Sequence, residues 1–437
     1  SLDLPGHVPA LDGIRGIAVL QVFVAHFHWI VSTDPYFNAV TPWHWLNKTL
    51  EPGFLGVDIF FAISGFVITK SLLERAPKSA FSFFTGFYRR RFIRIAPALF
   101  VYLAAFTALA SYFIPKTTIS GGIFETARWA IFGASNIQLV ASSDGYFAER
   151  MDYNPFIQTW SLGVEEQFYL IWPVLIAVVL KKYGRRPAKL GVIFLGISVA
   201  IAMYVAATYA PGVRGTPIET PEQYISLFGQ AVSRLDFLFL GTIGRSGGLF
   251  LGAALAFWFR PDMFRGSNNS SDRHVVSAFA IAGTAGLAYM MWTFRDVVLV
   301  AETGGVRGYD PLFQGGFLLV GVATCAIITA AVHPHSFIGN AVLGNPVFTY
   351  IGRRSYGLYL FHWPVFQLYR KVASNDLTLL QFVLLFAVIL ALTELSYRFI
   401  EMPVREGRLG EAWHMLRFPR TDSDIERRNK VFALGAV

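Results

Sequence analysis

Two ionisable side chains stand in the apolar stretch from Leu11 to Val31, which has the length of a membrane span. Arg15 lies at its start, and His26 follows eleven residues later. On a helix this separation is about 16 Å, so His26 would lie near the middle of a bilayer core about 30 Å thick. An ionisable group at that depth indicates a functional site, and an imidazole suits general-base chemistry. His26 is therefore a candidate catalytic residue; the competing interpretation is a core histidine bonded to a nearby carbonyl.

A second apolar stretch, GFLGVDIFFAISGFVITK, carries Asp58 near its predicted outer end and Ser64 near its middle. Gly56 and Gly65 allow neighbouring helices to approach closely. An acid inside a span needs a partner, so Asp58 is either paired structurally or placed for substrate.

Arg91 and Arg94 in FYRRRFIRIAP fall on one helical face, at positions i and i+3. One interpretation is an interfacial anchor that contacts lipid headgroups. The other is a phosphate clamp, because a guanidinium offers planar paired donors to phosphate oxygens.

The motif TWSLGVEEQFYLIWP contains Trp160 and the adjacent acids Glu165 and Glu166. Adjacent helical residues point about 100° apart, so one acid faces a shared cavity better than the other. We expect Glu165 to point inward, toward an Arg or His26, whereas Glu166 could also lie at a wet rim. Further on, Arg234 and His362 stand in RLDFLFLG and SYGLYLFHWP. His362 lies about 10 Å into its span, where packing or hydrogen bonding is the simpler role.

The elements that position these residues follow from composition. Of 437 residues, 54% are hydrophobic and 15% charged, which indicates an all-α polytopic membrane protein. No basic patch interleaved with stacking aromatics suggests nucleic acid, and the single Cys325 excludes an internal disulfide or a cysteine metal site. His333 and His335 alone are a weak metal signal, so no metal is expected.

The apolar runs predict about ten transmembrane helices. These are residues 14–31, 54–73, 95–114, 161–180, 189–209, 244–259, 275–294, 312–332, 355–371 and 378–399. Basic residues crowd the connections 74–94 and 181–189, which places both connections and the two ends of the chain on the cytoplasmic side. An even number of crossings must separate the two connections, and the spans 95–114 and 161–180 already supply two. The short apolar piece 127–141 between those spans is therefore expected to be a re-entrant or interfacial helix.

We expect a transmembrane domain over residues 9–405 and a basic cytoplasmic tail over 406–437. Because the chain ends in the apolar VFALGAV, the tail is expected to lead to a further span and an outer domain.

Taken in order, these motifs resemble those of the bacterial family 3 membrane acyltransferases. The resemblance covers about Pro9 to Arg405. It rests on LDGIRG followed by His26, on FFAISG, on the Arg91 and Arg94 pair, on WSLGVEEQFY and on SYGLYLFHWP.

The resemblance implies that a cytoplasmic acyl-CoA, either acetyl-CoA or succinyl-CoA, donates its acyl group to a hydroxyl of an envelope glycan or glycolipid. It implies a bacterial inner-membrane enzyme with His26 as its central residue. Arg15, Arg91 and Arg94 would bind the donor. Glu165 would assist catalysis, and Ser64 would hold the oxyanion or carry the acyl group. The remaining candidates for substrate binding are Asp58, Trp160, Glu166, Arg234 and His362.

Some members of this family carry an outer esterase-like domain, although no G-D-S block for one occurs in this chain. The alternative function is a proton-coupled transporter or flippase of an envelope precursor, in which the same buried groups form a pathway. The absence of an internal repeat counts against that alternative.

Overall fold

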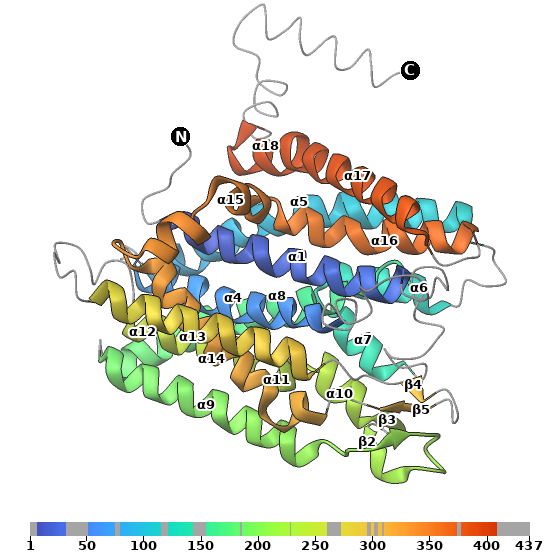
Figure 1. Ribbon diagram of the computed structural model, residues 1–437, viewed down its shortest axis with the longest axis horizontal. Helices are drawn as coiled ribbons and strands as arrows, with labels where there is room; N and C mark the ends of the chain where they lie inside the picture. The colour runs from blue at the N-terminus through green and yellow to red at the C-terminus, as the bar shows by residue number, and fades with distance from the viewer. Residues whose placement is uncertain are drawn as a thin grey trace, which may run out of the picture.

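Long helices running side by side make up most of the molecule (Figure 1). The computed structural model describes residues 7–31, 51–74, 79–114, 121–142, 154–183, 186–227, 229–259, 272–294, 299–300, 305–307, 310–373 and 377–408. Most of the predicted tail, residues 409–437, therefore lies outside the described residues.

Eight of the described helices are long and apolar enough to cross a bilayer. They are α1 (Pro9–Val31), α4 (Gly56–Leu73), α5 (Ala80–Phe113), α8 (Thr159–Tyr183), α9 (Pro187–Thr208), α13 (Asp272–Thr293), α14 (Phe317–Val332) and α17 (Leu379–Ser396). The expected all-α polytopic membrane fold is confirmed.

Two further predicted spans differ from these eight. The span predicted at 244–259 is a broken helix: α10 (Arg234–Leu240) stops at the extended residue Gly241, then α11 (Thr242–Arg245) and the short apolar α12 (Gly247–Trp258) follow. The span predicted at 355–371 is α16 (Ser355–Ala373), which is not among the eight and contains His362, Gln367, Arg370 and Lys371. Both pack inside the bundle, where neighbouring helices cover them.

The short apolar piece is a helical hairpin, α6 (Gly121–Ile131) and α7 (Ser135–Ala141). Its turn uses Gly133 at φ +63°, a conformation that other residues adopt at a cost. Gln167 on α8 donates to Gly133 O at 2.9 Å and to Asn136 Oδ1 at 2.8 Å. Asn136 in turn donates to Leu240 O at the broken helix, over 3.2 Å. Side chains thus satisfy the irregular backbone, as burial among apolar helices requires.

Short connecting elements complete the described chain. The strands β1 (Val213–Arg214), β5 (Gly305–Arg307) and β4 (Leu299–Val300) pair antiparallel in that order, and β2 (Tyr224–Leu227) pairs with β3 (Gln230–Ser233). These strands lie together at one end of the bundle (Figure 1). The remaining elements are η1 (Glu51–Leu55), η3 (Pro221–Gln223), η5 (Leu312–Gly316), η6 (Ile338–Leu343), α15 (Pro346–Arg353), η7 (Tyr397–Glu401) and α18 (Met402–Arg405).

Helix α4 occupies the centre because glycines let other helices approach it closely. A Cβ added at Gly65 would lie 1.9 Å from Leu249 O of α12, and one added at Gly252 would lie 1.9 Å from Ala62 O. Small residues at such contacts are the usual device for packing helices in membranes. This packing holds the motif residues of α4 against α8 and α12.

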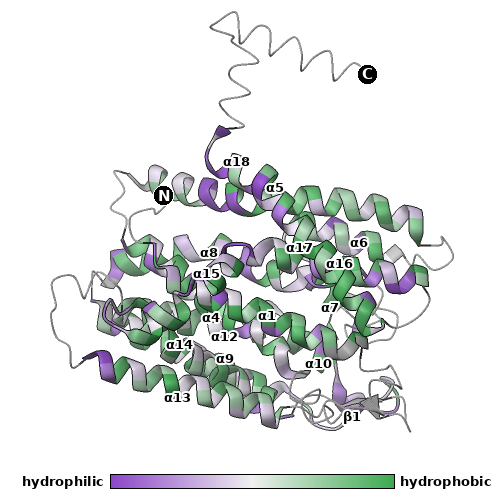
Figure 2. Cartoon of the chain, turned by 45° about the horizontal axis from the view of Figure 1, so that its top comes forward, coloured by the Kyte–Doolittle hydropathy of each residue, from purple (hydrophilic) through white to green (hydrophobic). Residues whose placement is uncertain are grey.

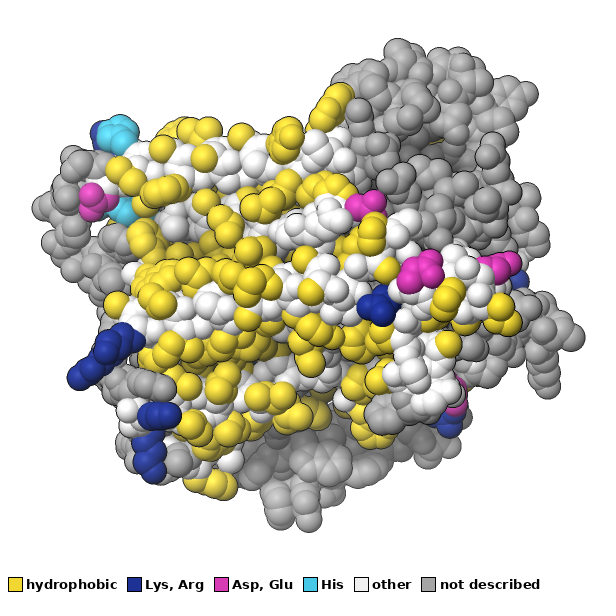
Figure 3. All heavy atoms as spheres, turned by 90° about the horizontal axis from the view of Figure 1, so that it is seen from below, with side chains coloured by type: hydrophobic (Ala, Val, Ile, Leu, Met, Phe, Trp, Pro, Cys, Tyr) yellow, Lys and Arg dark blue, Asp and Glu magenta, His cyan; other side chains and the backbone are white. Residues whose placement is uncertain are grey.

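The outer surface carries an apolar band. Figure 2 shows hydrophobic residues along most of the length of the long helices. On the face formed by α9 and α13, apolar side chains run in a broad band, with the largest groups of basic side chains at one end and most acidic ones at the other (Figure 3). This distribution is that of a lipid-facing surface, and the basic end matches the connection predicted to be cytoplasmic.

Candidate functional site

A cavity of about 90 Å³ lies between α1, α4, α5, α8 and α16. It collects residues from motifs that are distant in the sequence. Six of the predicted site residues line it: Arg15, Ser64, Arg91, Arg94, Glu165 and Glu166. On α8 the lining runs from Ser161 to Tyr169, about 12 Å along the helix axis.

The cavity is basic at one end. The guanidinium of Arg91 lies over the ring of Tyr169, 4.6 Å from its centroid, and Arg94 follows one turn later on α5. No carboxylate of the described residues forms an ion pair with Arg91 or Arg94. Arg15 enters from α1, and its contact with Asp12 is long, 3.4 Å from Nη1 to Oδ1. The cavity lining thus holds three guanidinium groups and two carboxylates, those of Glu165 and Glu166, a balance that favours an anionic ligand.

In the middle of the cavity, Glu165 accepts two hydrogen bonds. Ser64 Oγ donates to Oε1 at 2.8 Å, and Tyr169 Oη donates to Oε2 at 3.0 Å. Glu165 thus points into the cavity, but its hydrogen bonds go to Ser64 and Tyr169 and not to the expected Arg or His26. Glu166 lines the same cavity beside the hairpin turn at Gly133, so both acids reach it. The Ser64 hydroxyl proton is committed to Glu165, which leaves only its lone pairs for a ligand.

The other end of the cavity is aromatic. Phe60 of α4 and Tyr359 of α16 meet with ring centroids 6.4 Å apart. The Tyr359 hydroxyl lies 2.6 Å from Ser161 Oγ and donates to Gln158 O at 3.1 Å. These bonds hold the phenol ring across this end.

His26 is not among the residues that line the cavity; it lies beyond the aromatic end. Its ring packs on His362, at 4.9 Å between centroids, and on Trp363, at 4.7 Å. His362 follows Tyr359 by one turn of α16, and those two rings are 5.5 Å apart. His26 Nδ1 lies 2.8 Å from Val22 O, so Nδ1 carries the proton and Nε2 is the basic nitrogen. The order along the bundle is therefore arginines, Ser64 with Glu165, the aromatic pair, then the two histidines.

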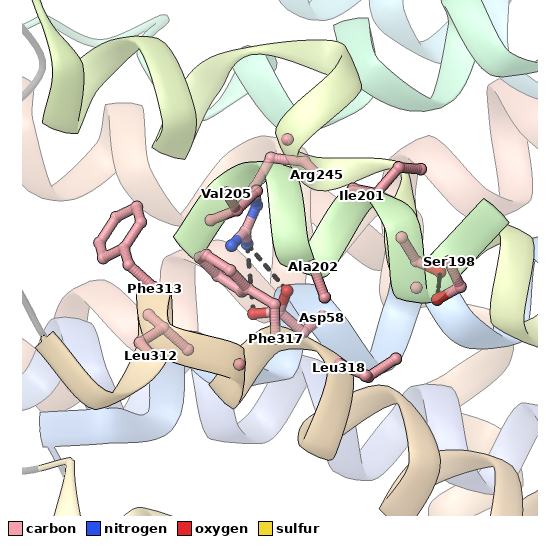
Figure 4. A pocket seen from close by; sticks show the side chains of 14 residues that line it. Asp58, Ser198, Ile201, Ala202, Val205, Arg245, Leu312, Phe313, Phe317 and Leu318 are labelled. Atoms are coloured by element: carbon pink, nitrogen blue, oxygen red, sulfur yellow. Dashed lines mark hydrogen bonds and ion pairs between the residues drawn. The ribbon is translucent and has the colours of Figure 1, made fainter. Parts of the chain in front are cut away.

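Three predicted substrate contacts lie elsewhere. Asp58 pairs with Arg245, whose Nη2 is 3.1 Å from Oδ1 and 3.2 Å from Oδ2 (Figure 4). The Arg245 guanidinium also lies over Phe317, at 4.1 Å, and beside Trp160, at 5.4 Å. The cavity beside Asp58 and Arg245 is only about 20 Å³, close to the space that one water needs.

Arg234 donates to the backbone oxygens of Thr208 and Tyr224 near the strands.

Local sequence explains how Arg15 is positioned. A Cβ added at Gly13 would lie 1.7 Å from Leu343 O, and one added at Gly16 would lie 2.4 Å from Phe348 O. The two glycines of LDGIRG thus let α1 pack directly on η6 and α15, and Arg15 on another face reaches the cavity. Asp12 in the same motif pairs with His7 at 2.8 Å.

Sequence reasoning missed Tyr169, Tyr359 and Arg245. Tyr169 and Tyr359 stand inside motifs already singled out, four residues after Glu165 and three before His362, so helical spacing could have indicated them. Arg245 lies inside the span predicted at 244–259, and only the packing of α4 on α12 identifies it as the partner of Asp58. No group of three or more potential metal ligands occurs in the part of the chain described.

The model of the acyltransferase domain family matches residues 8–398. A Staphylococcus aureus (strain COL) protein assigned as an O-acetyltransferase is 30% identical over 95% of this chain and 60% of its own length. The peptidoglycan O-acetyltransferase OatA of Listeria monocytogenes is 29% identical, over 92% of this chain and 56% of its own length. The chain thus spans less than two thirds of these relatives. No solved structure gives a significant match.

Proposed function

Because the chain belongs to the acyltransferase domain family, we propose that it is an integral membrane O-acyltransferase with acyl-CoA as its donor. The acceptor is a hydroxyl of an extracytoplasmic envelope glycan or glycolipid, and the enzyme resides in the bacterial inner membrane. One observation carries this proposal: three arginines and the Ser64–Glu165 pair share a cavity whose far end, at Tyr359, is linked to His26 through the ring of His362. Acetyl is the first choice of acyl group because the relatives are named O-acetyltransferases.

The spacing of the site suits a long, anionic donor. Arg15 and His26 are about 16 Å apart along α1, a separation comparable to an extended pantetheine arm. With the phosphates of CoA on Arg15, Arg91 and Arg94, the arm runs through the cavity and its thioester reaches the aromatic end. Ser64 and Glu165 then lie beside the amide groups of the arm, where a carboxylate accepts from an amide N–H.

His26 supplies the base. Its Nε2 takes the proton of the acceptor hydroxyl while the oxygen attacks the thioester carbonyl. The new ester bond forms as the carbon–sulfur bond breaks. His26 then gives its proton to the departing sulfur, so CoA leaves as the thiol. The hydrogen bond from Nδ1 to Val22 O keeps the ring in the tautomer that this role requires.

The remaining residues have other roles. Tyr359 and Phe60 stand between the cavity and the histidines, so the thioester must pass them to reach His26. We assign Asp58 and Trp160 a structural part, since both belong to the buried cluster around Arg245. Arg234 holds the end of α9 to the strand pair through backbone oxygens.

The test is CoA release by purified protein in nanodiscs, with acetyl-CoA or succinyl-CoA, with and without soluble peptidoglycan fragments. We expect acceptor-stimulated release by the wild type that is lost in His26→Ala. His335→Ala, which changes an exposed histidine, is the matched control and should keep full activity. Equal rates for wild type and folded His26→Ala would refute His26 as the base. Absence of CoA release from both thioesters would refute acyl-CoA as the donor.

A further inference from the structure

His362 has an acceptor atom for which the fold provides no partner. Its side chain is fully buried, with 0% of its surface exposed. Nδ1 lies 2.8 Å from Tyr359 O and 3.2 Å from Leu358 O, and only a protonated nitrogen can donate to carbonyls. Nε2 must therefore carry a lone pair, and it contacts no donor among the described residues.

The backbone carbonyl left open beside His362 is satisfied by a side chain. Pro364 has no N–H, which leaves Leu360 O without its usual partner in the helix. Gln158 fills this gap by donating to Leu360 O at 3.1 Å. Trp363 is held similarly, with its indole N–H donating to Asn154 O at 2.8 Å. Nε2 of His362 and Oε1 of Gln158 are the acceptors that lack a partner in this part of the described structure. An unsatisfied buried acceptor beside a proposed catalytic residue calls for an explanation, and a ligand that donates to it is one.

His362 also duplicates the arrangement of His26. In each residue Nδ1 donates to a carbonyl one turn earlier on its own helix, so in each the lone pair is on Nε2. The two rings are in contact, 4.9 Å between centroids, and Phe23 closes one side at 5.0 Å from His362. The open acceptor of His362 thus lies on a ring that contacts the proposed base, where a ligand bound to His26 could bring a second donor.

We propose that His362 Nε2 binds a second O–H or N–H group of the acceptor, next to the hydroxyl that His26 deprotonates. This inference rests on the proposed function and specifies its substrate class. The acceptor is a sugar unit that carries at least two donors within reach of one another, not a simple alcohol. Binding at two points selects which hydroxyl faces His26, because the second donor fixes the orientation of the sugar.

The substitutions His362→Asn and His362→Gln form a matched pair. The amide of Asn occupies the position of Nδ1, so it keeps the bond to the backbone and loses the acceptor. The carbonyl of Gln occupies the position of Nε2 and restores an acceptor. Purified variants in nanodiscs are assayed for transfer to methyl N-acetylglucosaminide, for transfer to cyclohexanol, and for acetyl-CoA hydrolysis without acceptor.

We expect His362→Asn to raise KM for the glycoside by about tenfold, the effect of one lost hydrogen bond. KM for acetyl-CoA, hydrolysis and transfer to cyclohexanol should stay at wild-type values. His362→Gln should recover most of the loss for the glycoside.

Two results would overturn the inference. An unchanged KM for the glycoside in His362→Asn would mean that Nε2 contacts no acceptor group. A parallel fall of hydrolysis and of both transfers would mean that His362 acts through His26 instead. Either result leaves the proposed function intact, because that function fails only when the wild type releases no CoA or His26→Ala stays active.

Discussion

Ser64 on α4 donates a hydrogen bond to Glu165 on α8 over 2.8 Å, although the two residues are 101 positions apart in the sequence. This contact joins the FFAISG and WSLGVEEQFY motifs across one cavity. Glu165 receives a second bond from Tyr169, so its orientation does not depend on Ser64 alone.

Replacing Ser64 with alanine should weaken donor binding without unfolding the protein. The hydroxyl is lost from the wall along the pantetheine arm, while Tyr169 still holds Glu165. We expect KM for acetyl-CoA to rise by about three- to tenfold, with a small change in Tm. Ser111→Ala, a lipid-facing serine bonded only to its own helix, is the control and should leave both values unchanged. A Ser64→Ala variant with wild-type KM would remove Ser64 from the donor site.

Arg91→Gln and Arg94→Gln should impair binding of CoA by its phosphates. Each guanidinium lost removes a charge-assisted contact, which corresponds to about a ten- to hundredfold rise in KM for acetyl-CoA. S-acetylpantetheine lacks those phosphates, so its KM should barely change. Arg89→Gln, at an exposed position of the same helix, should match the wild type with both donors. Equal losses with both donors would show that the arginines do not bind phosphate.

Removing one partner of the Asp58–Arg245 pair should destabilise the fold. Asp58→Asn leaves a buried guanidinium without its counter-ion, at a cost of about 3–5 kcal/mol. Thermal unfolding in detergent should show a clear fall in Tm, and the double variant Asp58→Leu/Arg245→Met should recover much of it. KM for donor and acceptor in the folded fraction should remain those of the wild type. A selective rise in acceptor KM would instead return Asp58 to the substrate site.

Gly13→Ala should disrupt the packing of α1 on η6. The added methyl would lie 1.7 Å from Leu343 O, a backbone atom that cannot move aside alone. We expect lower Tm and lower activity together, because Arg15 and His26 both depend on the position of α1. Gly286→Ala, whose nearest contact would be Ala323 Cβ at 3.9 Å, is the control and should be tolerated. A Gly13→Ala protein of normal stability would contradict this packing.

Sequence reasoning reached the helical fold and a short helical piece at 127–141 because both follow from apolar length and charge placement. It did not foresee that Gly133 divides this piece into the two helices α6 and α7. It also identified the cavity residues Arg15, Arg91, Arg94, Ser64 and Glu165 from their positions along the predicted spans and, for the ionisable ones, from their charge. It could not separate His26 from the cavity, because which residues of one helix meet another depends on packing. The Asp58–Arg245 pair shows the same limit: only the close contact of Gly65 and Gly252 across α4 and α12 brings the two charges together.

The path from the arginines to His26 is the central claim, and transfer across a sealed membrane tests it most directly. Proteoliposomes would hold a soluble peptidoglycan fragment inside and receive [¹⁴C]acetyl-CoA outside, with protein orientation determined by protease access. We predict labelled glycan inside the vesicles, formed by molecules whose arginine end faces outward, and none with His26→Ala or with Arg91→Gln/Arg94→Gln. Labelled glycan that forms only when donor and acceptor share one side would contradict the account.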